Sequence, residues 1–468
     1  MDNINMDNTD ILRRVKRMHF VGIGGSGMSP LAEILHSRGY IITGSDVNQS
    51  DNVERMRSLG IPVTLTQQEQ NVGQAELVVY TAAINPENPE LVWATDNGIP
   101  LIERGKLLGL ITQEYARTIG VAGTHGKTTT TSMLAQLLLQ GEFDPSVFIG
   151  GRLPLINANG RAGSSDIMVC EACEYQDHYL SMTPAVSVIL NIDADHLDYF
   201  GTLANVINSF HRFAGLASNT VIVNADDANS LKAVEGIADR QIITFGLKEG
   251  CDWYAKDIKL INGSYGEYDL YYKGEKYSHI RLGVPGMHNV LNSLAAAAAA
   301  HWCGANAEQI AFGLQSFTGA GRRFEFLGTF GGVTVADDYA HHPTEISATL
   351  SAAKAMGYES VWAIFQPFTF SRTARHLEGF IESLSSADRV ILSDIMGSRE
   401  ENKWGVSSEQ ITKRIPGALY LPTFEEIAVF VAQNASQGEL VLTMGGGDIY
   451  KCARMIAKKL QQSDIKPR

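Results

Sequence analysis

Short apolar runs alternate with helical segments along most of the chain. Near the N-terminus this pattern predicts strands at Met18–Val21, Tyr40–Thr43 and Glu76–Tyr80, and a helix over Ser29–Ser37. Later apolar runs predict further strands at 167–171, 186–192, 220–224, 334–337, 361–366, 390–394 and 439–444. Strands that alternate with helices favour parallel or mixed sheets with helices on their faces. The predicted fold class is therefore α/β.

Residues 251–283 break this alternation. Runs rich in Tyr and Ile are separated there by Asn262-Gly263 and Lys273-Gly274, which are typical of β-hairpin turns. A helix is expected over Asn289–Ala300, and glycines between 319 and 332 then mark a junction. A chain of 468 residues is long enough for several cores. We expect three domains, at residues 1–112, 113–318 and 319–468.

Residues 120–132, Gly-Val-Ala-Gly-Thr-His-Gly-Lys-Thr-Thr-Thr-Thr-Ser, lie between an apolar strand and a helix. Small residues let backbone N–H groups close around phosphate oxygens, and the helix N-terminus adds positive potential. The general P-loop spacing fails, because Val121 stands where its first glycine would be. The stretch still favours a phosphate site over a solvated turn. Its expected binding residues are Gly123, Thr124, His125, Gly126, Lys127, Thr128 and Thr129.

A second glycine loop, Gly22-Ile-Gly24-Gly25-Ser-Gly27, follows the first strand and opens its helix. With Asp46 at the end of the next strand it fits the dinucleotide fingerprint, and alone it would indicate NAD. The motif requires only a pyrophosphate and a ribose, so a UDP group also satisfies it. Because the chain has another nucleotide loop, we expect a nucleotide-linked substrate here. Its predicted contacts are Gly22, Gly24, Gly25, Ser26, Gly27, Met28, Ser45 and Asp46.

Carboxylates and an imidazole collect at the ends of two predicted strands in the middle of the chain. Glu171 and Glu174 end one strand, and His196 follows the next. Ligands bind at the carboxyl ends of strands in open sheets, and the phosphate loop leaves from the same edge. A carboxylate and a neutral imidazole can hold Mg²⁺ there, and the Thr128 hydroxyl is a further oxygen ligand. The expected metal ligands are Thr128, Glu171 and His196.

Polar residues of the last third suit other parts of a nucleotide. Asn289 and Asn292 lie one helical turn apart and can read an adenine edge, although such residues are more often helix caps. Arg322 and Arg323 offer guanidinium groups suited to phosphate oxygens. The run Asp337-Asp338-Tyr339-Ala340-His341-His342-Pro343 ends a strand, which favours a site over a surface His pair.

The composition of the chain limits the kinds of binding partner that it can have. A net charge of −13 and a pI near 5.4 argue against a broad nucleic-acid or anionic-membrane surface. The sequence shows no apolar stretch of transmembrane length and no signal-peptide core, so we expect a cytoplasmic protein. Five cysteines make no disulfide framework. One Cys-x-x-C pair, Cys170 and Cys173, has no second pair, which disfavours zinc and redox chemistry.

These motifs run in one order across almost the whole chain: Gly-Ile-Gly-Gly-Ser-Gly-Met-Ser, Gly-Thr-His-Gly-Lys-Thr-Thr-Thr, Glu-Ala-Cys-Glu-Tyr, Asp-His, His-Asn-Val-Leu-Asn, Gly-Arg-Arg-Phe-Glu, Asp-Asp-Tyr-Ala-His-His-Pro-Thr-Glu and Phe-Gln-Pro. In that order the chain resembles the Mur ligases, ATP-dependent amide-forming enzymes of cell-wall precursor synthesis. The resemblance implies a Rossmann-like N-terminal domain for a UDP substrate. It further implies a central P-loop ATPase-type domain with a mixed sheet, and a Rossmann-like C-terminal domain that closes on ATP and the amino acid.

The resemblance also implies a reaction. ATP would phosphorylate the lactyl carboxylate of UDP-N-acetylmuramate, and L-alanine would displace the phosphate, with ATP and Mg²⁺ as cofactors. Later Mur ligases carry a carbamylated lysine after the Asp-His motif. Residues 197–220 contain no lysine, which fits the alanine-adding branch. The expected partners are these small molecules, with neither nucleic acid nor membrane, and the chain is expected as a monomer or homodimer.

The resemblance assigns roles to the candidate residues. Lys127 would hold the γ-phosphate, Thr128 and Glu171 one Mg²⁺, and Glu171 with His196 a second. Arg322 or Arg323 would hold the departing phosphoryl group, and Asp337 or Asp338 the ribose or the third-domain end of ATP. The implied catalytic residues are Lys127, Glu171, His196, Arg322 and Arg323; adenine would be read by Asn289 and Asn292; and the substrates would also contact His125, Glu174, Asn191, Tyr339 and Arg372.

One departure concerns the amino-acid pocket. The family's Phe-Gln-Pro is usually followed by His, whereas this chain has Phe368, and Arg372 remains as the candidate for the incoming carboxylate. Three alternatives stay open: a muropeptide-recycling ligase with a roomier amine pocket, an NAD-dependent oxidoreductase, and a non-catalytic nucleotide-binding scaffold.

Overall fold

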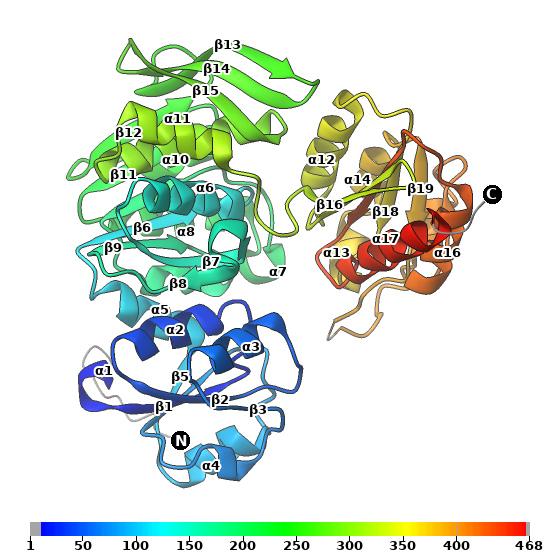
Figure 1. Cartoon of the computed structure of the whole chain (residues 1–468). Coiled ribbons are helices and arrows are strands. Elements are labelled where there is room, and N and C mark those ends of the chain that lie inside the picture. Colours follow the sequence, from blue (N-terminus) through cyan, green and yellow to red (C-terminus); the bar gives the residue numbers. More distant parts are fainter. Residues whose placement is uncertain (1–10, 399, 465–468) are drawn as a thin grey trace. The chain divides into compact units, whose positions relative to one another are not determined.

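The computed structural model describes residues 11–398 and 400–464 and contains three β-sheets flanked by helices (Figure 1), which confirms the α/β fold class. The chain forms two compact units. One holds the residues up to 256 together with 269–279 and 291–315, and the other holds 257–268, 280–290 and 316–468. Within the described residues, no helix is both long and apolar enough to span a membrane.

The N-terminal sheet has five parallel strands in the order β3-β2-β1-β4-β5. Its strands are β1 (Arg17–Val21), β2 (Ile41–Ser45), β3 (Val63–Thr64), β4 (Leu77–Tyr80) and β5 (Leu101–Glu103). The accompanying helices are α1 (Ile11–Arg14), α2 (Ser29–Ser37), α3 (Asp51–Ser58), the 3₁₀ turn η2 (Glu69–Asn71), α4 (Pro89–Asp96) and α5 (Arg104–Thr112). The predicted helix over Ser29–Ser37 is confirmed as α2.

Successive residues of a strand point to opposite faces, and this sheet is covered on both. Phe20 lies in the core beneath α2 and α3, whereas Val21 lies in a second core with Leu91 and Ala94 of α4. Figure 1 shows the same division, with α2 and α3 on one side of the sheet and α4 on the other. Because β1 is central, with β2 and β4 on either side, the loop after β1 opens at the topological switch point of the sheet.

The middle sheet has ten strands in the order β15-β14-β13-β12-β11-β10-β6-β9-β7-β8. They are β6 (Arg117–Ala122), β7 (Ser146–Leu153), β8 (Ala158–Arg161), β9 (Ile167–Glu171), β10 (Val186–Ile189), β11 (Thr220–Asn224), β12 (Gln241–Gly246), β13 (Trp253–Ile261), β14 (Tyr265–Tyr272) and β15 (Glu275–Pro285). Its helices are α6 (Lys127–Gln140), η3 (Pro154–Ile156), η4 (Tyr175–Ser181), α7 (Leu197–Phe200), α8 (Leu203–Leu216), α9 (Ala228–Val234), α10 (His288–Trp302) and α11 (Ala307–Ser316).

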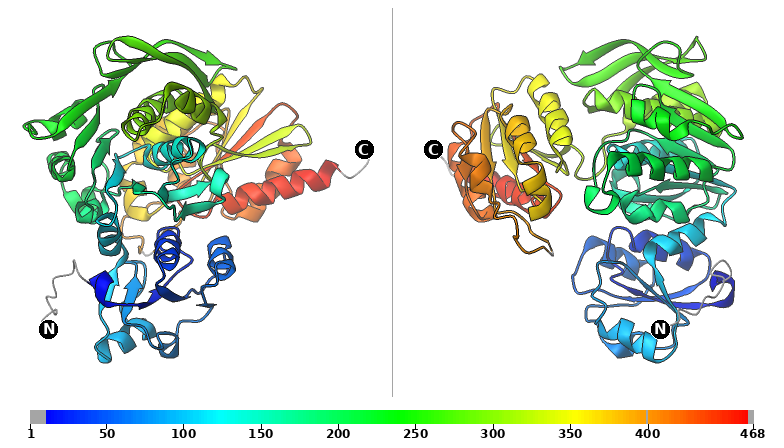
Figure 2. Two further views of the ribbon diagram at one scale, coloured as in Figure 1. Left: turned by 60° about the vertical axis from the view of Figure 1, so that its left-hand side comes forward. Right: turned by 180° about the vertical axis from the view of Figure 1, so that it is seen from behind.

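The predicted hairpins are confirmed. Asn262-Gly263 joins β13 to β14 and Lys273-Gly274 joins β14 to β15, and Figure 2 shows the three strands as one curved ribbon. All four turn residues have positive φ, between 49° and 85°. Two consecutive positive φ values give a turn whose twist matches that of the flanking strands. This explains why glycine is the second residue of both turns.

The predicted strand over 186–192 is wrong at its end, because β10 stops at Ile189. Beyond that point Asn191 turns away from the ladder, and its carbonyl accepts from the Thr124 N–H at 2.9 Å. The apolar pattern continues through Ile192 because that side chain is buried in the core. Buried residues therefore extend beyond the last residue that pairs in the strand.

The C-terminal sheet has six strands in the order β16-β17-β21-β18-β19-β20, and only β16 is antiparallel to its neighbour. Its strands are β16 (Glu325–Phe330), β17 (Val333–Asp338), β18 (Val361–Phe365), β19 (Arg389–Leu392), β20 (Leu419–Tyr420) and β21 (Leu440–Met444). Its helices are α12 (Pro343–Ala355), α13 (Phe370–Arg375), α14 (Leu377–Leu384), α15 (Ser408–Thr412), α16 (Phe424–Asn434) and α17 (Tyr450–Asp464).

Two cores enclose this sheet. Ala363 and Phe365 of β18 face α12 and α14, whereas Trp362 and Ile364 face α16 and α17. Figure 1 shows these helix pairs on opposite sides of the strands. The carboxyl ends of β17, β21 and β18 therefore form one open edge of the domain.

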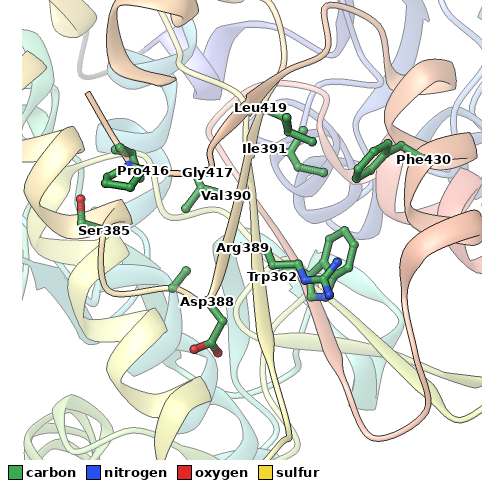
Figure 3. A pocket seen from close by; sticks show the side chains of 12 residues that line it. Trp362, Ser385, Asp388, Arg389, Val390, Ile391, Pro416, Gly417, Leu419 and Phe430 are labelled. Atoms are coloured by element: carbon green, nitrogen blue, oxygen red, sulfur yellow. The ribbon is translucent and has the colours of Figure 1, made fainter. Parts of the chain in front are cut away.

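A pocket of about 510 Å³ opens at the other edge, near the amino-terminal ends of β18, β19 and β20 (Figure 3). The Arg389 guanidinium lies 4.5 Å above the Trp362 ring, and the Asp388 carboxylate binds Lys354 at 2.6 Å. The charges lining this pocket are thus engaged within the domain, and the pocket is separate from the carboxyl edge where the candidate residues lie.

Candidate active site

The phosphate loop leaves β6, which lies between β9 and β10, so the ends of three adjacent strands converge as the sequence predicts. Gly126 precedes α6 with φ of +85°, a conformation that side chains with a Cβ rarely adopt. Asn191 fastens the loop: its Oδ1 accepts from the His125 N–H at 2.8 Å and its Nδ2 donates to the His125 carbonyl at 3.0 Å. The predicted substrate contact Asn191 therefore also shapes the loop.

Lys127 is held inside the loop by three hydrogen bonds. Its ammonium donates to the carbonyls of Gly123 at 2.5 Å and Thr124 at 3.1 Å, and to Glu174 Oε1 at 2.9 Å. The side chains of Lys127 and Glu174 are only 15% and 3% exposed. Burial alone would lower the pKa of Lys127, but the Glu174 carboxylate outweighs it and holds that pKa above its ordinary value. The sequence did not indicate this pair.

Glu171 and Thr128 offer oxygen ligands beside the loop. The Thr128 hydroxyl donates to Glu171 Oε1 at 3.1 Å, and the Gly150 N–H donates to Glu171 Oε2 at 2.8 Å. A hydroxyl and a carboxylate at hydrogen-bond distance form a donor set that Mg²⁺ prefers. These two residues therefore fit the predicted magnesium site.

His196 stands at the start of α7 with φ of +52°. Its ring lies 4.8 Å from the Tyr175 ring, and its Nε2 is 3.8 Å from an Asp195 oxygen. An imidazole held between an aromatic face and a carboxylate has a defined orientation, as a metal ligand requires. Its predicted pairing with Glu171 in a second magnesium site stays a prediction.

The segment after Glu174 is strained, and sequence reasoning missed it. Gln176 and Asp177 both have positive φ, at 55° and 58°. The Asp177 carboxylate holds this shape by accepting from the hydroxyls of Tyr199 (at 3.1 Å) and Ser209. Consecutive strained residues persist only where surrounding contacts fix them, and they cluster at functional sites. In the sequence, this segment could be suspected only from Asp177, a carboxylate that follows the Glu-Ala-Cys-Glu-Tyr motif at the end of β9.

The surroundings of Cys170 and Cys173 disfavour the thiolate form. All five cysteines are free, and Cys170 is buried within β9. Burial raises the pKa of the Cys173 thiol to about 11, so the thiolate needed for metal or redox chemistry is scarce at neutral pH.

Four amides of the first glycine loop are hydrogen-bonded within the protein, among them Gly25, which donates to the Gly22 carbonyl at 3.1 Å. The Ser45 carbonyl accepts from the N–H groups of Gly22 at 2.8 Å and Ile23 at 3.0 Å, and Asp46 Oδ2 accepts from Gly24 at 2.9 Å. Asp46 and Ser45, predicted as substrate contacts, thus brace the loop. Within the described part of the chain, the amides of Ser26 and Gly27 have no protein partner, which leaves them for an anionic ligand.

Arg104, which sequence reasoning missed, lies against this loop. A Cβ built on Gly27 would stand 2.9 Å from Arg104 Nη1. Arg104 begins α5 directly after the short strand β5, and its guanidinium therefore approaches the carboxyl edge of the sheet. A three-residue strand gives little apolar signal, which explains the omission.

In the C-terminal unit the structure separates the two adjacent arginines. The Arg322 guanidinium donates to Asp337 Oδ2 at 3.0 Å and to the carbonyls of Gly445 and Gly447, both at 2.8 Å. Its donors are thereby engaged in holding the loop after β21. The Arg323 guanidinium lies 5.1 Å above the Tyr339 ring. The Arg322 guanidinium lies over the same ring at 4.8 Å, so the role of either arginine at a phosphoryl group stays a prediction.

The two adjacent aspartates also differ. Asp337 accepts from Arg322 and from the Thr443 hydroxyl, so both of its carboxylate oxygens have partners within the domain. Asp338 accepts from the N–H groups of Phe324 and Ala340, both at 2.7 Å. Burial raises the pKa of Asp338 to about 6, and Arg323 only partly offsets this. Asp338 therefore titrates near neutral pH.

The elevated pKa of Asp338 predicts a pH-dependent stability. Its folded pKa of about 6 exceeds its unfolded value of 3.8, so its stabilising contribution is present below pH 3.8 and is lost as pH rises through 6. The full loss is about 3 kcal/mol. Asp338→Asn should remove this slope between pH 4 and 6, whatever its constant cost in hydrogen bonds. Thermal unfolding of both chains across that range is the measurement, and parallel curves would contradict the prediction.

A glycine loop after β21 was also missed. Gly445, Gly446 and Gly447 precede α17, and Gly446 lies against the His341 and Phe368 side chains: a Cβ there would meet them at 3.2 and 3.5 Å. The signal was present in Met-Gly-Gly-Gly-Asp after an apolar run, a strand followed by a glycine loop and a helix.

The remaining candidates lie on helix starts. Arg372 is on α13, whose N-cap Thr369 accepts from the Arg372 N–H at 3.4 Å. The Asn289 side-chain amide donates to the Pro285 carbonyl at 2.6 Å, which ties the first turn of α10 to the end of β15. Asn292 contacts the phosphate loop, since a Cβ on Gly126 would lie 2.6 Å from its Oδ1. Only Asn292 of this pair is placed beside the loop by these contacts.

Comparison with known proteins follows the same order of domains. Family models match three stretches: the Mur ligase family catalytic domain at residues 17–116, the Mur ligase middle domain at 121–300, and the Mur ligase glutamate ligase domain at 322–447. The UDP-N-acetylmuramate–L-alanine ligase of Caldanaerobacter subterraneus subsp. tengcongensis is 43% identical over 446 residues, which cover 94% of this chain and 97% of that protein. The enzyme of that name from Acetivibrio thermocellus is 42% identical over 465 residues, covering 97% and 99%.

A solved structure agrees with these relatives. The crystal structure of the UDP-N-acetylmuramate-alanine ligase from Thermotoga maritima matches with a TM-score of 0.82 and 28% identity, covering 96% of this chain and 99% of that one. The family models span all three sheets, and the relatives cover nearly the whole chain. The chain therefore belongs to the Mur ligase family.

Proposed function

We propose that this protein is an ATP-dependent ligase that joins L-alanine to the lactyl carboxylate of UDP-N-acetylmuramate in peptidoglycan precursor synthesis. The observation that carries the proposal is the phosphate loop, where Lys127, Thr128 and Glu171 converge beside the end of β10. Full-length similarity to alanine-adding relatives supports the choice of substrates. A muropeptide-accepting ligase is the second candidate, because Phe368 stands where the family usually has His.

The reaction needs two transfers. A lactyl carboxylate oxygen attacks the γ-phosphorus and the bond to ADP breaks, giving an acyl phosphate. The neutral amine of alanine then attacks the acyl carbon, phosphate departs from the tetrahedral intermediate, and the amine loses a proton. Positioning and neutralisation of phosphate charge supply most of the catalysis in such reactions.

The chain's own residues have separate parts in this scheme. Lys127 binds a terminal phosphate oxygen, and Arg323 receives the phosphoryl group while Arg322 holds the loop after β21. Thr128 and Glu171 would hold Mg²⁺, which neutralises phosphate charge when bound. Asn292 lies close enough to the loop to contact the nucleotide. Bringing residues of both compact units to one reaction is part of the proposal.

Phosphate release with ATP, Mg²⁺ and UDP-N-acetylmuramate tests the function. Alanine, glycine, serine and a tripeptide are compared as acceptors, and alanine should give the highest kcat/KM. A preference for the tripeptide would establish the recycling ligase instead. Calorimetry with UDP-N-acetylmuramate and with NAD tests the first glycine loop, where NAD binding at similar concentration would contradict a UDP site.

Arg104 should contribute to binding of the UDP substrate. Its guanidinium stands beside the Gly27 amide, where a pyrophosphate would gain a charge-assisted hydrogen bond. Arg104→Ala should weaken binding of UDP-N-acetylmuramate by about tenfold and leave ADP affinity unchanged. Calorimetry measures both, and Arg414→Ala, an exposed arginine that pairs with Glu378, is the control. An equal loss of ADP affinity would contradict the assignment.

Arg372 should hold the carboxylate of the incoming amino acid. Arg372→Ala should raise the KM for alanine by about tenfold or more while leaving that for ATP nearly unchanged. Phe368→His should have a small effect. The single neutral hydrogen bond that a His would offer the amino acid can already be made by a backbone group or a water molecule. Steady-state kinetics with varied alanine measure both. A larger effect of Phe368→His than of Arg372→Ala would place the acceptor elsewhere.

A further inference from the structure

The unexplained feature of the phosphate loop is the buried carboxylate of Glu174. Its Oε1 accepts from Lys127 at 2.9 Å, while its Oε2 is buried with no hydrogen-bond partner among the described residues. Among residues 11–398 and 400–464, Lys127 is thus the one side chain that hydrogen-bonds this carboxylate. The contact joins residues 47 positions apart, from the start of α6 and the segment after β9. Resemblance to the family implied only a substrate contact for Glu174.

The ammonium of Lys127 is fully engaged without a nucleotide. An ammonium has three donors, and the carbonyls of Gly123 and Thr124 with Glu174 take all three. The two carbonyls carry no net charge, so Glu174 is the anion that hydrogen-bonds Lys127, and the nearby Glu171 carboxylate adds a weaker attraction. A phosphate approaching the loop therefore meets a neutral, internally satisfied pair, and must compete with a buried carboxylate for the lysine.

We propose that Glu174 neutralises Lys127 so that the loop binds uncomplexed nucleotide poorly and gains affinity when Mg²⁺ accompanies the nucleotide. The inference rests on the proposed function, since it assigns ATP to this loop. Glu171 and Thr128, the oxygen pair that fits Mg²⁺, lie on the same loop edge. Their oxygens supply the cation site that replaces the charge Glu174 cancels. Glu174 is a positioning residue in this account and touches no reacting atom.

Electrostatics give the expected size of the effect. Coulomb energy scales with the product of the charges, so a carboxylate repels ADP, with three negative charges, about three times as strongly as Mg·ADP, with one. Glu174→Gln keeps the shape of the side chain and removes its charge. It should tighten ADP binding in EDTA by about tenfold, and binding in excess Mg²⁺ by only about twofold. The ratio of the two dissociation constants should therefore fall about fivefold.

Calorimetry of ADP binding by the full chain, in EDTA and in Mg²⁺, tests this. Glu235→Gln, an exposed acid at the end of α9, is the matched control and should change neither constant. Should Glu174→Gln fold poorly, Glu174→Ala gives the same comparison.

The outcomes separate the two proposals. A parent chain that binds no ADP under either condition overturns the ATP-site assignment itself. A parent that binds ADP, together with an unchanged or weaker Mg²⁺-free affinity in Glu174→Gln, overturns the role of Glu174 alone. If Glu174→Gln instead weakens binding of UDP-N-acetylmuramate and leaves ADP unaffected, the carboxylate contacts the substrate as the family resemblance implied.

Discussion

Lys127→Met should reduce ATP-dependent phosphate release by about a thousandfold or more. Lys127 is the one Lys or Arg residue of the 120–132 stretch, and transition-state charge contacts of this kind are worth factors of a hundred to a thousand or above. Lys127 also supports the structure of the loop, because it binds two loop carbonyls and Glu174. Initial rates with saturating substrates are the measurement.

Removing one member of a buried ion pair leaves the other uncompensated, at a cost of about 3–5 kcal/mol. Lys127→Met should therefore also unfold at lower temperature. Combining it with Glu174→Gln should restore most of that stability without restoring activity, which separates the chemical loss from the structural one. Lys232→Met, an exposed lysine of α9, is the control. Substantial turnover in the stabilised double variant would refute the phosphate-site assignment.

Glu171→Gln should lower kcat by about a hundredfold and raise the Mg²⁺ concentration needed for half-maximal rate. The substitution preserves an oxygen that can accept from Thr128 or Gly150, but it removes the charge that makes a carboxylate a good Mg²⁺ ligand. Rates titrated with Mg²⁺ at fixed ATP measure both effects.

A matched variant distinguishes metal binding from a general loss of negative charge. Glu235→Gln removes an exposed acid of the same unit and should leave the Mg²⁺ titration unchanged. If Glu171→Gln lowers kcat but the Mg²⁺ dependence stays that of the parent chain, the carboxylate acts on something other than the metal.

Much of the fold could be predicted because its signals are local. The apolar runs coincide with the observed elements at 167–171, 220–224 and 29–37. Fully buried strands and amphipathic helices require apolar residues at regular nearby positions, and this pattern is visible in a short stretch of sequence. Glycine loops are equally local, because the required φ values restrict the residue type. The short edge strands β3 and β20, with two residues each, carry no such run.

The site was predicted in part for the same reason. Lys127 and Thr128 lie in a loop that its own residues define. Arg322, by contrast, has φ of +61° and binds the carbonyls of Gly445 and Gly447 within its domain, and its sequence position beside Arg323 gives no sign of this. Contacts such as Glu174 with Lys127, or Arg104 with Gly27, depend on which strands lie side by side, and no short window of sequence records that.

The position of β21 bears on how this chain is made. It is the last strand in the sequence, yet it lies between β17 and β18 in the middle of the C-terminal sheet. During synthesis, β17 and β18 must therefore wait, each with an unpaired edge, until residues 440–444 have left the ribosome. Exposed strand edges invite pairing with other chains. A chain truncated before residue 440 should accordingly aggregate in cells, although most of its length and both glycine loops of its N-terminal half would be intact.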